Sequence, residues 1–149
     1  MMRLLYFGFR IYCYIFRPKT LGVRIMLIQN GQVLLIRQTY LSGWYMPGGG
    51  VKRGETLAQT ARREAYEEVG AEMGVLKLLG TYTHFGDQKS DHNVLFLCTD
   101  FTLKEKHDKE IAEVRFFPLD TLPDGLMEGH RKRLEEYHSG AKIPQFGEW

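Results

Sequence analysis

One stretch of the chain, from Gly49 to Ala71, carries fixed residue types at spacings that fit a tight loop followed by a helix. It reads Gly49, five residues, Glu55, seven residues, and then R-E-A-Y-E-E-V-G-A. Within residues 56–69 apolar side chains recur at steps of four, which is the period of one helix face. Thr56 is a suitable N-cap and Gly70 a suitable stop. The spacing therefore predicts a helix whose start is joined to a glycine-rich loop.

Three acids of this helix lie at i, i+3 and i+4, so Glu64, Glu67 and Glu68 share one patch of its surface. Each like-charge pair costs a few tenths of a kcal/mol when exposed, and partial burial raises that cost. A positive partner is expected, either Arg63 or a divalent cation. An all-oxygen site suits Mg²⁺ shared with substrate phosphates. A glutamate that does not bind the ion can then take the proton from an attacking water.

The preceding loop, Pro47-Gly48-Gly49-Gly50, has no side chains that would keep a ligand away from its backbone. It leads into the N-terminus of the helix, where free N–H groups favour anions. Gly48 and Gly49 are therefore predicted to contact the substrate. Glu55 and Arg63 are interpreted as a structural pair that locks the loop to the helix.

The rest of the chain predicts one α/β domain. Apolar, β-branched runs predict strands over 21–28 and 33–36 around Asn30-Gly31, a strong hairpin signal, and further strands over 75–82, 94–101 and 114–117. A short strand is expected at 44–46, and Asp124 is expected to cap a last helix ending near residue 137. The predicted division is an N-terminal helix over 1–19 packed on the domain, the domain over 20–140, and a tail over 141–149.

The first seventeen residues contain six aromatic residues and three arginines. Arginines interrupt the apolar run, which excludes a membrane span, and no small-residue cleavage site follows, which excludes a secretory signal. As a helix this segment places Arg3, Arg10 and Arg17 on one stripe. We expect its aromatic face to dock on the domain; membrane adhesion or a dimer contact is the alternative.

Bulk properties restrict the compartment and the partners. Cys13 and Cys98 have no paired spacing, which favours free buried thiols in the cytoplasm. A net charge of +2 gives no field that demands nucleic acid, so DNA is not an expected partner.

The segment Gly49–Ala71 resembles the Nudix box, G-x5-E-x7-R-E-U-x-E-E-x-G-U, where U is a bulky aliphatic residue. All seven fixed positions match, while Ala65 and Ala71 stand at U positions, where they alter packing rather than ligands. The likeness extends over most of residues 20–138. It implies a MutT-like Nudix hydrolase: an α/β/α sandwich around a mixed sheet. Such an enzyme uses Mg²⁺ or Mn²⁺ to cleave a nucleoside diphosphate linked to another moiety.

The same resemblance implies residue roles and leaves the substrate open. Glu64, Glu67 and Glu68 match the metal ligands of the family, and the Gly49 carbonyl is a usual further ligand. A downstream acid often joins them; Glu110 fits it best, with Asp108 and Glu113 as rivals. Arg37 matches a position that contacts a phosphate in some members.

The sequence marks of substrate subclasses are absent. Residues 86–89 hold neither the proline of ADP-ribose enzymes nor the tyrosine of diadenosine polyphosphate enzymes. A small nucleotide or nucleotide sugar is the expected substrate. The alternatives are an RNA 5′-end pyrophosphohydrolase and a nucleotide-binding module without catalysis.

Overall fold

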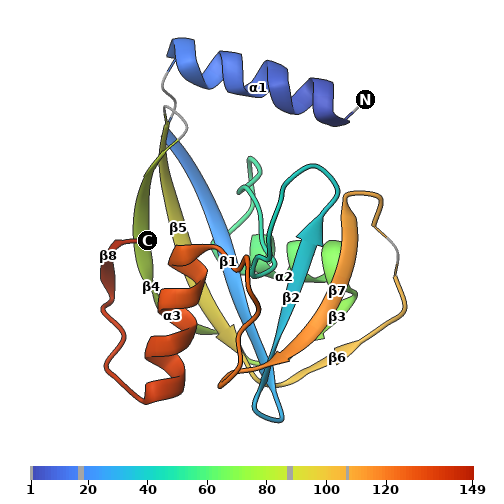
Figure 1. Ribbon diagram of the computed structural model, residues 1–149, viewed down its shortest axis with the longest axis vertical. Helices are drawn as coiled ribbons and strands as arrows, with labels where there is room; N and C mark the ends of the chain where they lie inside the picture. The colour runs from blue at the N-terminus through green and yellow to red at the C-terminus, as the bar shows by residue number, and fades with distance from the viewer. Residues whose placement is uncertain (1, 17–18, 87–88, 107) are drawn as a thin grey trace.

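A six-stranded mixed sheet, in the order β7-β2-β1-β5-β4-β8, organises the molecule (Figure 1). The computed structural model describes residues 2–16, 19–86, 89–106 and 108–149, and the side chains of all of these except residues 2–4 and 13. The elements are α1 (Met2–Phe16), β1 (Lys19–Gln29), β2 (Gln32–Gln38), α2 (Leu57–Val69), β3 (Ala71–Met73), β4 (Lys77–Gly86), β5 (Lys89–Cys98), β6 (Phe101–Leu103), β7 (Ile111–Pro118), α3 (Glu128–Ser139) and β8 (Phe146–Glu148). Strands β3 and β6 form a separate antiparallel pair.

The hairpin predicted around Asn30-Gly31 joins β1 to β2. Asn30 has φ 53° and Gly31 has φ 73°. Positive φ at both central residues is the two-residue turn whose twist matches antiparallel strands. On its other side β1 pairs in parallel with β5 over nine residues, which makes β1 a central strand.

Helices α2 and α3 cover opposite faces of the sheet (Figure 1). Alternate residues of β1 supply the two cores, because successive side chains of a strand point to opposite faces. Val23, Ile25 and Leu27 pack with Ala61 and Ala65 of α2. On the other face Met26 and Ile28 pack in one cluster with Leu134 of α3. The α/β/α sandwich around a mixed sheet is confirmed.

Helix α2 has the ends that the sequence predicts. The Thr56 side chain accepts a hydrogen bond from the Gln59 N–H, and the Gln59 side chain accepts one from the Thr56 N–H, which is a complete capping box. Gly70 ends the helix at φ 69°, in the left-handed region. Its carbonyl accepts the Lys104 N–H at 2.9 Å, which ties the end of α2 to the chain beyond β6.

Other sequence predictions were wrong at their boundaries. Helix α3 begins at Glu128 and not after Asp124. The reason is that the preceding segment pairs with Trp44: the Trp44 N–H donates to the Gly125 carbonyl, and the Met127 N–H donates to that of Trp44. This pairing also replaces the short strand expected at 44–46 by isolated bridges.

The segment 141–149, expected as a tail, adds strand β8, which pairs in parallel with β4. The Trp149 N–H donates to the Thr83 carbonyl, and the Trp149 ring meets His130 at a centroid distance of 5.1 Å. The end of the chain is therefore part of the domain.

Helix α1 lies across one end of the sheet (Figure 1). Tyr6 meets the Tyr40 ring at 5.8 Å, and Lys89 lies 5.9 Å from the Phe9 ring. Most described side chains of α1 are exposed, so the expected burial of its aromatic face against the domain is not seen. The end of a sheet offers backbone and loops, and the apolar faces are already covered by α2 and α3.

Of the three arginines predicted to form a stripe, Arg17 and the side chain of Arg3 lie outside the described residues, as does the side chain of Cys13. Cys98 is buried and free. None of the described helices has the length and apolar character needed to cross a membrane.

Candidate active site

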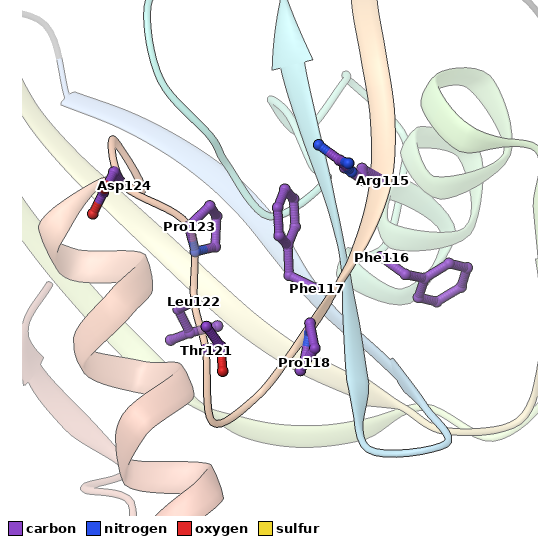
Figure 2. A pocket seen from close by; sticks show the side chains of 8 residues that line it. All are labelled: Arg115, Phe116, Phe117, Pro118, Thr121, Leu122, Pro123 and Asp124. Atoms are coloured by element: carbon purple, nitrogen blue, oxygen red, sulfur yellow. The ribbon is translucent and has the colours of Figure 1, made fainter.

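Two hollows flank strand β7. A groove of 620 Å³ is formed by β7 and the segment that leads to α3 (Figure 2), and it is lined by Arg115, Phe116, Phe117, Pro118, Thr121, Leu122, Pro123 and Asp124. A cavity of 250 Å³ lies beside α2 and is lined by Glu68, Lys106, Asp108, Ile111, Ala112, Glu113 and Val114. The second contains a box glutamate and further acids, so it is the one that adjoins the candidate site.

The glycine loop is fixed along strand β1 by backbone hydrogen bonds. The Ile25 N–H donates to the Pro47 carbonyl and the Val23 N–H to the Gly49 carbonyl, both at 2.9 Å. Gly48 has φ 145°, and a Cβ atom there would overlap the Val23 carbonyl oxygen. The close approach of loop and strand therefore requires glycine at this position.

Helix α2 meets the loop through two glutamates. A Cβ atom at Gly49 would lie 2.6 Å from the Glu64 carboxylate, so glycine leaves the space that this carboxylate uses. Glu68 is buried, and its Oε2 accepts the Gly48 N–H at 2.8 Å. Burial raises the pKa of Glu68 to about 8, although the Gly48 N–H and the charge of Arg24 act in the opposite direction.

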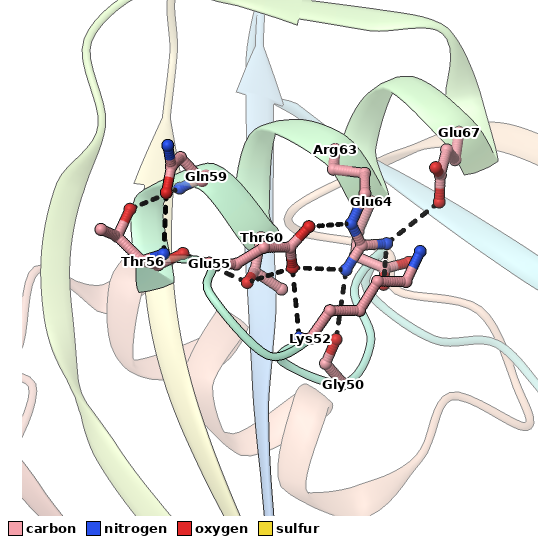
Figure 3. A network of polar contacts seen from close by, with 9 residues as sticks. All are labelled: Gly50, Lys52, Glu55, Thr56, Gln59, Thr60, Arg63, Glu64 and Glu67. Carbon is pink, nitrogen blue, oxygen red and sulfur yellow. Dashed lines mark hydrogen bonds and ion pairs between the residues drawn. The ribbon is translucent and has the colours of Figure 1, made fainter.

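Arg63 holds the acids of the box together (Figure 3). Its Nε donates to Glu55 at 2.6 Å, and its Nη1 donates to Glu64 at 2.6 Å and to Glu67 at 3.0 Å. Its Nη2 reaches the Gly50 carbonyl at 3.2 Å. The Arg63 hydrogen bond lowers the pKa of Glu55 to about 2. Glu55 and Arg63 thus bridge the loop and the helix directly.

The carboxylates face different partners. Glu64 and Glu67 turn to Arg63, while Glu68 turns to the Gly48 N–H. Within the described parts of the chain, no three His, Cys, Asp or Glu side chains are oriented together as a cation-binding group. The donor set itself, three carboxylates of α2 together with the carbonyls of the adjoining loop, consists of hard oxygens and fits Mg²⁺ or Mn²⁺.

The downstream acids are separated by the structure. Asp108 and Glu113 line the cavity with Glu68, and the charge of Asp108 acts on Glu68. Glu110 is exposed; its N–H donates to Asp108 at 2.7 Å and its carbonyl accepts the Thr39 N–H. Asp108 thus lines the cavity with Glu68 and Glu110 does not, while the charges of Glu110 and Glu68 both act on Tyr40; the identity of the downstream ligand stays a prediction.

Arg37 is not brought to the box glutamates. Its guanidinium lies 4.8 Å from the centre of the Trp44 ring and 3.6 Å from Glu113. Trp44 belongs to the core on the α3 side of the sheet, whereas α2 packs on the other side. Through Glu113, Arg37 is connected to the cavity that Glu68 lines, and its contact with a phosphate stays a prediction.

Sequence reasoning missed Arg24, a half-buried side chain on β1. Its Nη1 donates to the Gly48 carbonyl at 3.0 Å. Burial is the largest influence on two nearby groups: it raises the pKa of Glu68 and lowers that of His130. The charge of Arg24 acts to lower the pKa of both. It forms no ion pair with a carboxylate of the described residues. The signal was present, since Arg24 interrupts the apolar run of residues 21–28.

Comparisons with known proteins agree with this geometry. A NUDIX domain model matches residues 18–137. The chain is 36% identical over 99 residues to a putative mutator protein, MutT4, of Mycobacterium tuberculosis (62% of this chain, 40% of that protein). It is 41% identical over 70 residues to an RNA pyrophosphohydrolase of Psychromonas ingrahamii (47% and 38%). These matches span about two fifths of each relative's length.

Solved structures support the fold. The crystal structure of a MutT NUDIX hydrolase from Burkholderia pseudomallei superposes with a TM-score of 0.72 at 24% identity, covering 78% of this chain and 96% of that one. The family model matches residues 18–137, which is most of the chain. The structure agrees with that match, because it fixes the glycine loop to β1 and joins it to a capped helix that carries Glu64, Glu67 and Glu68. The chain is a member of the Nudix family.

Proposed function

We propose that this protein is a cytoplasmic, divalent-metal-dependent hydrolase of a pyrophosphate bond in a nucleoside diphosphate linked to another moiety. The observation that carries the proposal is the contact of two box glutamates with two loop glycines, Glu64 with Gly49 and Glu68 with Gly48. A loop that binds phosphates is thereby joined to a helix face of carboxylates. The free buried thiol of Cys98 is consistent with a reducing compartment.

Glu64, Glu67, Glu68 and the Gly49 carbonyl would hold the ion, with Asp108 as the fifth donor and Glu110 as its rival. Bound Mg²⁺ or Mn²⁺ supplies charge that polarises phosphoryl oxygens and lowers the pKa of water. One of these three glutamates, released from the ion or not needed to hold it, would accept the proton of the attacking water. Arg63 positions Glu64 and Glu67 and limits their repulsion before the ion binds.

Arg24 is proposed to contact a substrate phosphate. The Nη1 atom of Arg24 donates to the Gly48 carbonyl, and within the described residues its other N–H groups can donate to a ligand beside the loop. A guanidinium next to a glycine loop suits phosphate oxygens, because charge-assisted hydrogen bonds of this kind are strong. Gly48 and Gly49 supply backbone that a ligand can approach closely.

The second candidate function is removal of pyrophosphate from RNA 5′ ends. It is favoured by the likeness to an RNA pyrophosphohydrolase, although that match covers 47% of this chain. RNA binding would fall steeply with salt, whereas cleavage of a mononucleotide substrate would depend on salt only weakly. A nucleotide sensor without chemistry is disfavoured, because every acid of the box is retained.

The test is a panel of nucleoside triphosphates, nucleotide sugars, dinucleotides and 5′-triphosphate RNA, each with Mg²⁺ and with Mn²⁺. Glu67→Gln should lower kcat by about 10²-fold or more, because it removes a carboxylate needed for the ion or for the proton. Thermal unfolding should be little changed, since Glu67 is 41% exposed. Glu135→Gln, at an exposed position of α3, is the matched control. Full activity in Glu67→Gln, or tight nucleotide binding without product, contradicts the proposal.

A further inference from the structure

Helix α1 presents apolar side chains to solvent from Leu5 to Phe16. Eight of them are between 44% and 69% exposed: Leu5, Phe7, Phe9, Ile11, Tyr12, Tyr14, Ile15 and Phe16. Some of these rings already pack on one another, with Tyr12 4.9 Å from Phe16 and 6.4 Å from Phe9 between centroids. An apolar surface of this kind marks an interaction site.

The apolar side of α1 points away from the domain. At about 100° per residue, Leu5, Ile11, Tyr12 and Ile15 fall on one side of the helix. The contacts with the domain come from elsewhere on its circumference, through Tyr6 to Tyr40 and Phe9 to Lys89. The domain therefore leaves the apolar side uncovered.

Charge is distributed unevenly along the sequence. Residues 1–54 contain eight Lys and Arg and no Asp or Glu, so all eighteen acids of the chain lie at Glu55 or beyond. Arg3 and Arg10 belong to α1, and Lys19 is the first residue of β1. Lys19 and Phe85 both lie opposite Ser90 in the sheet register, at the end that α1 crosses, and Phe85 is 69% exposed. This end combines apolar and basic groups.

We propose that α1 binds in the plane of an anionic lipid bilayer, with Ile11 and Ile15 inserted and Arg10 among the headgroups. Fifteen residues of helix span about 22 Å, less than the ~30 Å hydrocarbon core, so α1 lies on the surface and does not cross it. Tyrosines at this depth suit the interface, and basic residues are attracted to anionic headgroups.

A second copy of the chain fits the apolar side of α1 less well than an anionic bilayer does. Packing α1 on α1 would bring two sets of arginines together. The acids that could pair with them begin at Glu55, and the box acid Glu55 already pairs with Arg63. A bilayer that contains anionic lipid satisfies the apolar and the basic groups together.

The experiment measures sedimentation of the full chain, without substrate, with vesicles of phosphatidylcholine alone or mixed with phosphatidylglycerol. We expect binding to the mixed vesicles, little binding to phosphatidylcholine alone, and loss of binding as salt rises. Ile11→Ser with Ile15→Ser should weaken binding on the order of 10-fold or more, because two apolar side chains no longer insert. Val75→Ser with Leu78→Ser, at exposed positions near the start of β4, should bind as the natural chain does.

A second pair of variants tests the charge without changing the apolar side. Arg10→Glu should reduce binding to mixed vesicles, and Arg10→Lys should retain it. Circular dichroism and hydrolysis of a soluble nucleotide should be unchanged in every variant, since none touches the candidate active site; loss of vesicle binding is thus separable from failure of the proposed hydrolase.

Two results would overturn the proposal. One is that the natural chain stays in the supernatant with both kinds of vesicle. The other is a dimer in sedimentation velocity that becomes a monomer in Ile11→Ser with Ile15→Ser while vesicle binding is absent, which would assign the apolar side to a second copy.

Discussion

At the scale of single residues, two arginines contact different parts of the site. Arg63 contacts three carboxylates and holds these acids together around its guanidinium. Within the described residues, Arg24 donates one hydrogen bond, to a loop carbonyl. The first matches a fixed box position and was predicted from spacing. The second was not, because the meaning of an arginine in a strand depends on which loop lies beside it.

Replacing Arg24 tests its proposed contact with phosphate. Arg24→Ala should lower kcat/KM by about 10- to 100-fold, the size of one lost charge-assisted contact. Arg24→Lys should recover part of this loss, because it restores charge without the fork of donors. Arg115→Ala, at an exposed position of β7, is the control and should have near-normal kinetics. Unchanged kcat/KM in Arg24→Ala would remove the residue from the site.

The bond between Glu55 and Arg63 predicts a pH dependence of stability. The folded-state pKa of Glu55 is lowered from 4.5 to about 2, so its carboxylate stabilises the fold above pH 4.5 and that contribution is lost as pH falls towards 2. The thermal midpoint of Glu55→Gln should therefore be lower than that of the natural chain at neutral pH, and the two should converge towards pH 2. A constant difference over this range would refute the linkage.

At the scale of elements, helix α2 and the first hairpin were predictable because their signals are local. Thr56, Gly70 and Asn30-Gly31 each fix the backbone through their own side chain or its absence. The start of α3 was not predictable, because the residues just before the helix form backbone hydrogen bonds with Trp44. Trp44 precedes those residues by more than 80 positions in the sequence. The same is true of β8, whose partner β4 precedes it by about sixty residues.

Gly70 and Gly140 form a matched pair for testing the end of α2. They have φ 69° and 70°, so alanine is strained at both by about 1 kcal/mol. At Gly70 a Cβ atom would also overlap the Lys104 carbonyl oxygen, whereas at Gly140 it meets open space. Gly70→Ala should therefore cost clearly more in chemical denaturation than Gly140→Ala. Equal costs would mean that the Lys104 segment yields freely.

At the scale of the whole molecule, the sandwich was predictable and the arrangement of its site only in part. The resemblance indicated a mixed sheet between helices, and the alternation along β1 supplies both cores. Which acid approaches Glu68 was not predictable, because residues 108–113 are close in sequence and only the path of the loop separates Asp108 from Glu110. The exposure of most described α1 side chains was not predictable either, since apolar composition does not say which surface will cover them.

The double attachment of the glycine loop gives a physical reason for the fixed number of residues between Gly49 and Glu55 in the box. One side of the loop is held by β1, and the other side meets α2 through Glu64 and Glu68. Residues 50–55 thus connect a loop held on β1 to the start of α2, and both of these are fixed in position. Inserting or deleting even one residue there would rotate the helix relative to the strand and pull the carboxylates out of reach of the loop, while leaving each element able to form.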